Sequence, residues 1–316
     1  YNGQDSEISA LLGKCGFTRD SPQLEKMGRL DLKRIKVQKE IASQPLAVSY
    51  LKACADAARN AAVVHVHSPN MLAALAVLRL PLHIKVVVHW HADIENKGMI
   101  GRLVRPIERA MLRRADTIVV TTQNYANASS ALKGYDNRVK VIPIGIADVV
   151  KAPKFETATP PYVLFVGRLV PYKGLNVLLD AIAMVQSDAE FKIVGIGPQL
   201  TDLQDHARRL GISDRVKFMG RVGENQLQSL MEGAAVFCLP SINRLEAFGV
   251  VLLEAMRARR AIVSTNIPGS GVPWVNSTGI NVPVGNPRAL ADAIDQLLTD
   301  PEEAARLGML ARSLFE

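Results

Sequence analysis

The sequence predicts an α/β protein of two doubly wound domains, each a parallel sheet with helices on both faces. Short β-branched runs alternate with helical patterns along most of the 316 residues, which is typical of successive βα units. The alternation stops once, in residues 146–161, where periodicity is lost and the segment ends in Pro160 and Pro161. This stretch is therefore the predicted linker between two sheets.

The first domain is predicted to span residues 1–148. Its continuous apolar runs are typical of strands buried on both faces of a parallel sheet. The predicted strands are residues 62–68, 85–91, 117–122 and 139–145.

The second domain is predicted to span residues 149–316, where the same alternation resumes. The predicted strands are residues 162–168, 191–197, 215–220, 236–241 and 261–265. Ligands of doubly wound sheets bind at the carboxyl ends of the strands. The residues that carry chemistry should therefore follow strands and face a cleft between the two domains.

Composition restricts the class of protein. Hydrophobic residues make up 48% and charged residues 22% of the chain, as in an ordinary globular enzyme. Three dispersed cysteines suit neither a disulfide framework nor a metal cluster and favour a reducing cytoplasm. The longest apolar run, residues 71–82, is too short to span a membrane. The chain begins at Tyr1, which leaves open a preceding native segment.

The net charge of +8 lies entirely in the first half. Residues 1–150 hold 21 basic and 13 acidic side chains (21 − 13 = +8), whereas residues 151–316 hold 17 of each. Arginines recur at helical spacing in residues 101–116, and such a basic amphipathic helix can lie on anionic lipid. A core-packed helix with a solvated basic face fits equally well. No nucleic-acid-binding motif occurs, so we expect no nucleic-acid partner. The arginines are Arg102, Arg105, Arg109 and Arg113.

The segment GRLVPYKG (167–174) follows a predicted strand. Gly167 allows close backbone approach, Arg168 is a permanent two-pronged cation, and Lys173 stands at the start of the next predicted helix. Cations beside a helix N-terminus suit a diphosphate and could neutralise a leaving nucleoside diphosphate without metal. A loop with ordinary surface charges is the alternative.

The segment EAFGVVLLEAM (246–256) also follows a predicted strand. Glu246 is expected before or at the start of a helix, with free backbone amides at Phe248 and Gly249. Glu254 lies eight residues on, about 80° round a helix from Glu246. Carboxylates can accept hydrogen bonds from vicinal hydroxyls of ribose or a hexose. A capping glutamate and a helical ion pair are the alternative.

GRLVPYKG, VGIGP and EAFGVVLLEAM in this order resemble the retaining glycosyltransferases of family 4, whose GT-B fold has two Rossmann-like domains facing a cleft. The resemblance implies that Arg168 and Lys173 hold the donor diphosphate and that Glu246 meets the transferred sugar. It implies that Glu254 binds the ribose. The remaining donor-binding positions that it implies are Gly167, Gly195, Gly197, Arg221, Val222, Phe248, Gly249 and Val250.

The first half is similar to the same family from about residue 60. In HWHADIENK (89–97), His91 matches the histidine near the donor sugar. The residues of this segment most resemble those of bacterial polysaccharide and O-antigen mannosyltransferases. This resemblance implies GDP-mannose as donor and a lipid-linked saccharide as acceptor. It implies a cytoplasmic enzyme, peripheral at the inner membrane face. A UDP-sugar hexosyltransferase and a non-catalytic sugar-nucleotide-binding relative stay open.

Two departures from the family pattern bear on the fold. The first residues, YNGQDSEISALLGKCG, show no clear strand followed by a glycine-rich loop. Arg259 stands where a helix-stopping glycine is expected.

Other chemistries find weaker support. His65 and His67 share a strand face, as do His89 and His91, but strand alternation produces such pairs by chance. Without a D-x-D triplet or a completing cysteine, we expect no metal ligands and no cofactor. A dinucleotide-binding loop would need a third glycine where Leu200 stands, and no G-x-S-x-G nucleophile motif occurs.

Overall fold

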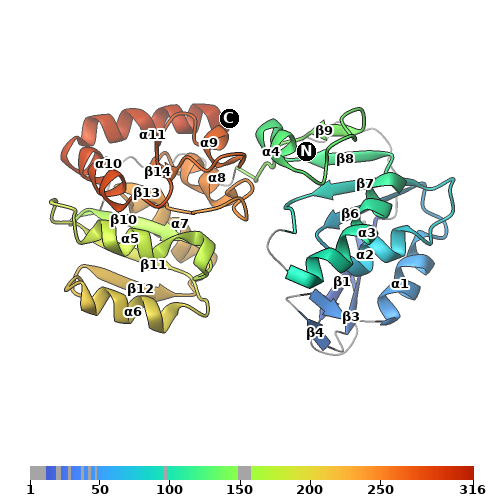
Figure 1. The fold of residues 1–316 in the computed structure, drawn as a ribbon. Coiled ribbons are helices and arrows are strands. Elements are labelled where there is room, and N and C mark those ends of the chain that lie inside the picture. Colours follow the sequence, from blue (N-terminus) through green and yellow to red (C-terminus); the bar gives the residue numbers. More distant parts are fainter. Residues whose placement is uncertain are drawn as a thin grey trace. The chain divides into compact units, whose positions relative to one another are not determined.

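The computed structural model describes residues 12–18, 23–27, 30–36, 39–41, 44–46, 48–94, 98–148 and 158–316, with side chains from residue 49 onward except 98–103. The chain divides into two compact units (Figure 1). The N-terminal unit comprises Tyr1–Val120 and Ala131–Lys140, and the C-terminal unit comprises Thr121–Ser130 and Val141–Glu316. Residues 149–157 lie outside the described residues, so the linker and the division after residue 148 stay predictions.

The N-terminal unit contains a four-stranded sheet in the order β6-β7-β8-β9. It confirms the four strands predicted between residues 62 and 145, and the last three of them end before the predicted residues 91, 122 and 145. The strands are β6 (Val63–Ser68), β7 (Lys85–Trp90), β8 (Thr117–Val120) and β9 (Val139–Val141). The helices of this unit are α1 (Val48–Ala58), α2 (Met71–Val77) and α3 (Gly98–Arg114).

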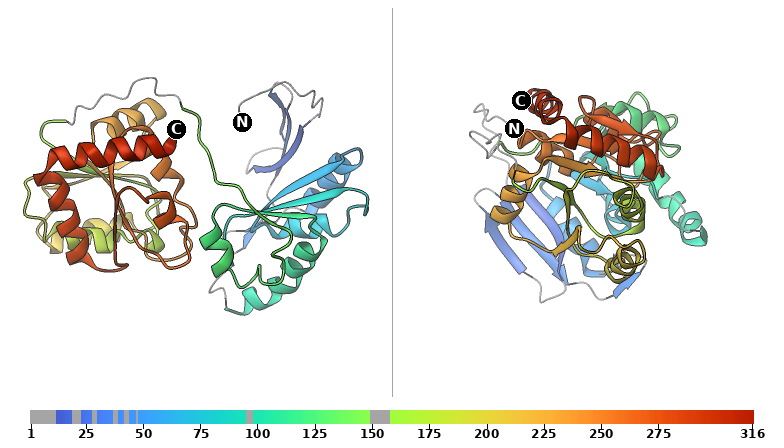
Figure 2. Two further views of the ribbon diagram at one scale, coloured as in Figure 1. Left: turned by 90° about the horizontal axis from the view of Figure 1, so that it is seen from above. Right: turned by 90° about the vertical axis from the view of Figure 1, so that its left-hand side faces the viewer.

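A further sheet precedes α1, drawn in blue in Figure 2. Its order is β1-β3-β2, with β3 parallel to β1 and antiparallel to β2. The sequence showed no clear opening strand, and β1 was missed because Gly13, Lys14, Cys15 and Gly16 interrupt its apolar run. The elements are β1 (Leu12–Thr18), β2 (Gln23–Met27), β3 (Leu30–Lys36) and the hairpin β4 (Lys39–Ile41) and β5 (Gln44–Leu46).

The C-terminal unit is built on a six-stranded sheet in the order β12-β11-β10-β13-β14-β15, and every pairing in it is parallel. Numbered within the unit, this is the order 3-2-1-4-5-6 of a doubly wound nucleotide-binding sheet. The strands are β10 (Tyr162–Val166), β11 (Glu190–Val194), β12 (Val216–Gly220), β13 (Val236–Leu239), β14 (Ala261–Thr265) and β15 (Ile280–Val282). All five predicted strands are confirmed, and β15 is additional.

Helices cover both faces of this sheet, as the right-hand view of Figure 2 shows. Helices α5 and α6 follow β10 and β11, and α5 also packs against α10. Asn286 and Asp300 begin α10 and α11 by accepting hydrogen bonds from backbone amides three residues on, as N-cap side chains do. These helices are α5 (Leu175–Ile182), α6 (Leu200–Arg209), α7 (Glu224–Gly233), α8 (Val250–Arg257), α9 (Val272–Val275), α10 (Pro287–Thr299) and α11 (Pro301–Phe315). Helix α4 (Gln123–Ala128) lies in sequence between β8 and β9 and is grouped with the C-terminal unit.

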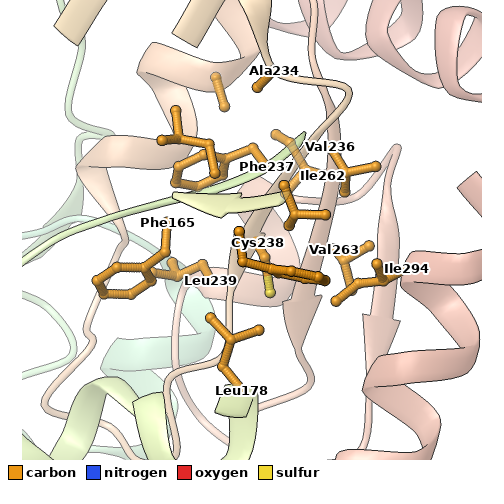
Figure 3. Packing of buried hydrophobic residues seen from close by; sticks show 14 of the residues in the cluster. Phe165, Leu178, Ala234, Val236, Phe237, Cys238, Leu239, Ile262, Val263 and Ile294 are labelled. Carbon is orange, nitrogen blue, oxygen red and sulfur yellow. The ribbon is translucent and has the colours of Figure 1, made fainter. Parts of the chain in front are cut away.

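The core of the C-terminal unit centres on β13 (Figure 3). All four of its residues are buried, because β13 lies between β10 and β14 with helices on both faces. Each such side chain contributes about 1.5–3 kcal/mol of hydrophobic free energy. Complete burial raises the pKa of the Cys238 thiol far above its ordinary value, so this cysteine packs as a hydrophobe and is no nucleophile.

The structure confirms that Arg259 stands, just after α8, where a helix-ending glycine is expected. Its φ is +58°, in the left-handed region where glycine ordinarily ends a helix. Among the described residues no helix is long and apolar enough to cross a membrane.

Candidate active site

The predicted donor residues of the C-terminal unit gather at one edge of its sheet. Gly167 directly follows β10, Gly195 follows β11, and Arg221 follows β12. Glu246 lies in the loop after β13. Because all these strands are parallel, the loops share the carboxyl edge, and the strand order reverses between β10 and β13. Such a switch point is where doubly wound sheets bind ligands.

The glycines after β10 and β11 allow two loops to meet. A Cβ on Gly195, whose φ is +141°, would lie 1.8 Å from the carbonyl oxygen of Gly167. A Cβ on Gly197 would lie 2.2 Å from the carbonyl oxygen of Leu169. Only glycine can hold these loops so close, so Gly195 and Gly197 have a packing role in addition to the predicted donor contact.

Lys173 and Glu246 form a buried ion pair at the switch point. Lys173 ends a 3₁₀ turn, η1 (Pro171–Lys173), rather than opening α5 as the sequence suggested. Its Nζ lies 2.5 Å from Oε2 of Glu246, and Ser241 Oγ donates a hydrogen bond of 2.8 Å to the same oxygen. Lys173 and Glu246 are 8% and 7% exposed. The sequence assigned them separate roles; their contact depends on β10 and β13 being neighbours.

Hydroxyl side chains that the sequence analysis missed hold the Glu246 loop in place. Ser270 Oγ donates to the carbonyl oxygen of Glu246 at 2.5 Å, and Thr265 Oγ1 donates to that of Ser241. The Gly271 amide donates to Ala247 at 2.8 Å. The available signal was the hydroxyl residues in and after β14, which follow the same edge of the sheet.

Helix α8 begins at Val250, with Gly249 as its N-cap at a φ of +77°. Glu246 lies four residues before the helix, so the expected angle of about 80° between the two glutamates was wrong. The Leu252 amide donates to the carbonyl oxygen of the N-cap Gly249 at 2.8 Å. The two amides before it, of Val250 and Val251, lie at the N-terminal end, where the helix offers no carbonyl to accept from them. Glu254, inside α8, is half-buried, and burial raises the pKa of its carboxyl despite the opposing charge of Arg257.

The other predicted donor residues differ in exposure. Phe248 is buried, Val250 is 38% exposed, and Val222 packs partly against the core. Arg221 is exposed. Arg168 is exposed as well, and its Nη2 donates to the hydroxyl of Tyr172 at 3.3 Å.

His91 belongs to the N-terminal unit, directly after β7. Its backbone amide donates to Ser68 at 3.0 Å. Its Nε2 lies 2.7 Å from Nδ1 of His67. Burial, followed by the charge of His65, lowers the pKa of His91.

The fold is that of a GT-B glycosyltransferase. Residues 148–314 match the family model "Glycosyl transferases group 1", and residues 16–145 match "Glycosyl transferase 4-like domain". The chain belongs to the family 4 glycosyltransferases.

Two relatives match along most of the chain. D-rhamnosyltransferase WbpZ of Pseudomonas aeruginosa is 31% identical over 89% of this chain and 76% of its own length. O-antigen chain mannosyltransferase C of Escherichia coli is 31% identical over 88% of this chain and 76% of its own.

Solved structures share the fold. Sucrose-phosphate synthase of Thermosynechococcus elongatus matches with a TM-score of 0.76 at 21% identity, over 95% of this chain and 83% of its own. Anabaena Alr3699/HepE in complex with UDP matches with a TM-score of 0.69 at 19% identity, over 91% and 82%.

Proposed function

We propose that this glycosyltransferase is retaining and metal-independent, and that it transfers a hexose, with mannose favoured, from a nucleotide sugar to a lipid-linked saccharide in bacterial O-antigen or polysaccharide assembly. The observation that carries the proposal is the Lys173–Glu246 pair at the switch point of a nucleotide-binding sheet. The similarity to an O-antigen mannosyltransferase over most of the chain supports it.

Lys173 can serve two partners at once. Its ammonium group has three N–H donors, and one is directed at Glu246. The others can bind donor phosphate oxygens, with Arg168 supplying a second cation from the same loop. Positive charge placed where the leaving diphosphate develops negative charge lowers the barrier without a metal ion.

Glu246 is the proposed contact for the transferred sugar. A carboxylate fixed by Lys173 and Ser241 retains acceptor capacity for sugar hydroxyls. The amides at the start of α8, from Phe248 to Val250, favour negative charge near the sugar and the phosphates. His91 is the proposed donor-side residue of the N-terminal unit. The acceptor hydroxyl attacks on the face that the diphosphate leaves, and a donor phosphate oxygen takes its proton.

Glu254 is the proposed ribose ligand. Its carboxylate is half-buried with a raised pKa, and two hydroxyls of a ribose would supply the hydrogen bonds that burial removes. The nucleotide base of the donor, guanine or uracil, stays open. A similar protein is named a GDP-mannose-dependent mannosyltransferase, whereas HepE binds UDP, so a UDP-sugar enzyme is the second candidate.

A thermal-shift panel tests the donor assignment. Ligands that bind only the folded state raise the melting temperature. We expect GDP-mannose and GDP to raise it, and we expect Glu254→Ala to abolish the shift while Glu224→Ala, an exposed glutamate on α7, leaves it intact. A shift with only UDP, UDP-glucose, UDP-galactose or UDP-N-acetylglucosamine would transfer the assignment to the second candidate. No shift with any compound would contradict the proposal.

Transfer itself tests the diphosphate role. Lys173→Ala and Arg168→Ala should each lower the transfer rate more than tenfold, about 1.4 kcal/mol or more, in buffer containing EDTA. Full activity in both variants, or loss of wild-type activity on adding EDTA, would contradict the mechanism.

The acceptor side of the proposal involves the membrane. Helix α3 exposes Arg105, Arg109 and Arg113 on one face, while Met111 and Leu112 are buried. Each basic residue near an anionic surface contributes about 1 kcal/mol of attraction. This face would hold a cytoplasmic enzyme at the inner membrane surface, where lipid-linked acceptors lie.

Sedimentation with phosphatidylglycerol vesicles at low salt tests the membrane contact. The triple variant Arg105→Ala, Arg109→Ala and Arg113→Ala should lose most of the bound fraction. The control variant replaces three exposed arginines of the C-terminal unit by alanine, Arg208, Arg209 and Arg288. Its charge change is equal, and it should keep the bound fraction. Failure of the wild type to sediment would contradict the membrane role.

A further inference from the structure

Four imidazole rings lie on one face of the sheet in the N-terminal unit. The register of β6 and β7 pairs His67 with His89, and strand alternation places His65 on the same face as His67. The rings stack with centroids 5.0 Å apart for His65–His67, 5.2 Å for His67–His89 and 4.2 Å for His89–His91. The sequence showed two pairs of histidines; the register joins them into one cluster.

Three of these rings bring nitrogen atoms together. One ring nitrogen from each of His65, His67 and His89 lies within 4.8 Å of those of the other two. Zinc–nitrogen bonds of about 2.0–2.1 Å in a tetrahedral site place ligand nitrogens about 3.4 Å apart. The three rings are stacked, with interplanar angles of 12° to 26°, so metal binding requires them to rotate until one nitrogen of each points at the same ion. The strand backbone already holds all three on one face.

One ring nitrogen of the cluster lacks a partner in the described part of the chain. Nε2 of His89 is buried and has no hydrogen-bond partner among the described residues, which is unfavourable for a buried polar atom. A bound cation would give this nitrogen a partner.

We propose that His65, His67 and His89 form a binding site for one transition-metal dication of the zinc type. Imidazole ligands suit zinc, copper and nickel rather than magnesium or calcium. Three protein ligands leave a fourth position for water, the arrangement of open zinc sites. The sequence led us to expect no metal ligands; the strand register is the observation that it could not supply.

His91 completes the arrangement as an outer partner. Metal-binding histidines usually donate their second ring N–H to a neighbouring acceptor. With the metal on Nε2 of His67, its Nδ1 carries the proton and donates to Nε2 of His91, 2.7 Å away. Metal binding would therefore fix the tautomer of His91. The transfer step proposed above requires neither the metal nor this tautomer, and the metal site does not rest on the proposed function.

Cobalt(II) titration of the untagged protein, stripped of metal by a chelator, tests the site. We expect one equivalent of Co²⁺ to bind with the intense visible absorption of a four-coordinate centre, and Zn²⁺ to displace it. His65→Gln and His89→Gln should each weaken binding at least tenfold. His83→Gln and His206→Gln, which replace the two histidines outside the cluster, should change nothing. No saturable spectrum in the wild type, or equal binding in His65→Gln, would overturn the proposal.

X-ray absorption gives a second readout that needs no cluster variant. The zinc-loaded double variant His83→Gln and His206→Gln should show imidazole scattering at about 2.0–2.1 Å. A coordination shell containing sulfur, or oxygen alone, would overturn the assignment. Neither measurement depends on glycosyl transfer, so failure here is distinct from failure of the proposed function.

Discussion

The Lys173–Glu246 pair can be tested as a buried interaction, independently of any substrate. The two side chains are 9% and 10% exposed, and their charged atoms are 2.5 Å apart. We predict that Lys173→Met and Glu246→Gln each lower the free energy of unfolding of the C-terminal unit by several kcal/mol. The double variant should lose much less than the sum of the two.

The magnitude follows from the geometry. At 2.5 Å and an effective dielectric constant of about 20, the attraction is about 7 kcal/mol. Desolvation of both ions offsets most of it, but removing one partner leaves an uncompensated buried charge, which costs about 3–5 kcal/mol. The hydrogen bond from Ser241 remains for Glu246, so Lys173→Met should lie near 3 kcal/mol, at the lower end of that range. The coupling energy should then be about 2 kcal/mol or more.

Urea unfolding supplies the measurement. Trp90 and Trp274 are the two tryptophans of the chain, so in a Trp90→Phe background the fluorescence of Trp274 reports on the C-terminal unit alone. The solvent-facing pair Glu303–Arg306 on α11, with Nε and Oε2 2.6 Å apart, is the control and should couple far more weakly than the buried pair. Additive losses for Lys173 and Glu246 would refute the reasoning.

Three further predictions concern stability. Arg259→Gly should raise the unfolding free energy by about 0.5–1 kcal/mol, because the left-handed φ strains an L-residue more than glycine loses in entropy; a lower urea midpoint would contradict this. Gly195→Ala should lower it by more than about 2 kcal/mol, since its Cβ would collide with a backbone oxygen, while Gly223→Ala, with open space around its Cβ, should change little; equal effects in a thermal melt would refute the packing argument. Burial, then Asp93, raises the pKa of Glu108 from 4.5 to about 7. Folding thus favours the protonated form, and the resulting stability of about 3 kcal/mol is fully present below pH 4.5 and lost as pH rises through 7. Glu108→Gln should remove this pH dependence of stability, measured as urea midpoints between pH 4.5 and 7. A slope of midpoint against pH that is the same in the variant and the wild type would reject the assignment to Glu108.

The sequence by itself determined the fold class and the order of the site segments. Apolar runs such as residues 162–166 and 236–239 are local patterns, and in a doubly wound sheet the residues after each run reach the same edge. Gly167, Lys173 and Glu246 were therefore predictable as residues at one edge of the sheet. Arg259 was also recognisable, because a helix end is set by the residues adjacent in the chain.

The tertiary structure alone decided which of these residues touch. The ion pair of Lys173 with Glu246 requires β13 to lie beside β10 although about 70 residues separate them, which is a crossover that local patterns do not encode. The joining of His65, His67 and His89 depends on the register of β6 against β7, and a slip of one residue would turn His89 to the other face. Contacts between distant segments are fixed by packing of the whole sheet, so no single stretch of sequence specifies them.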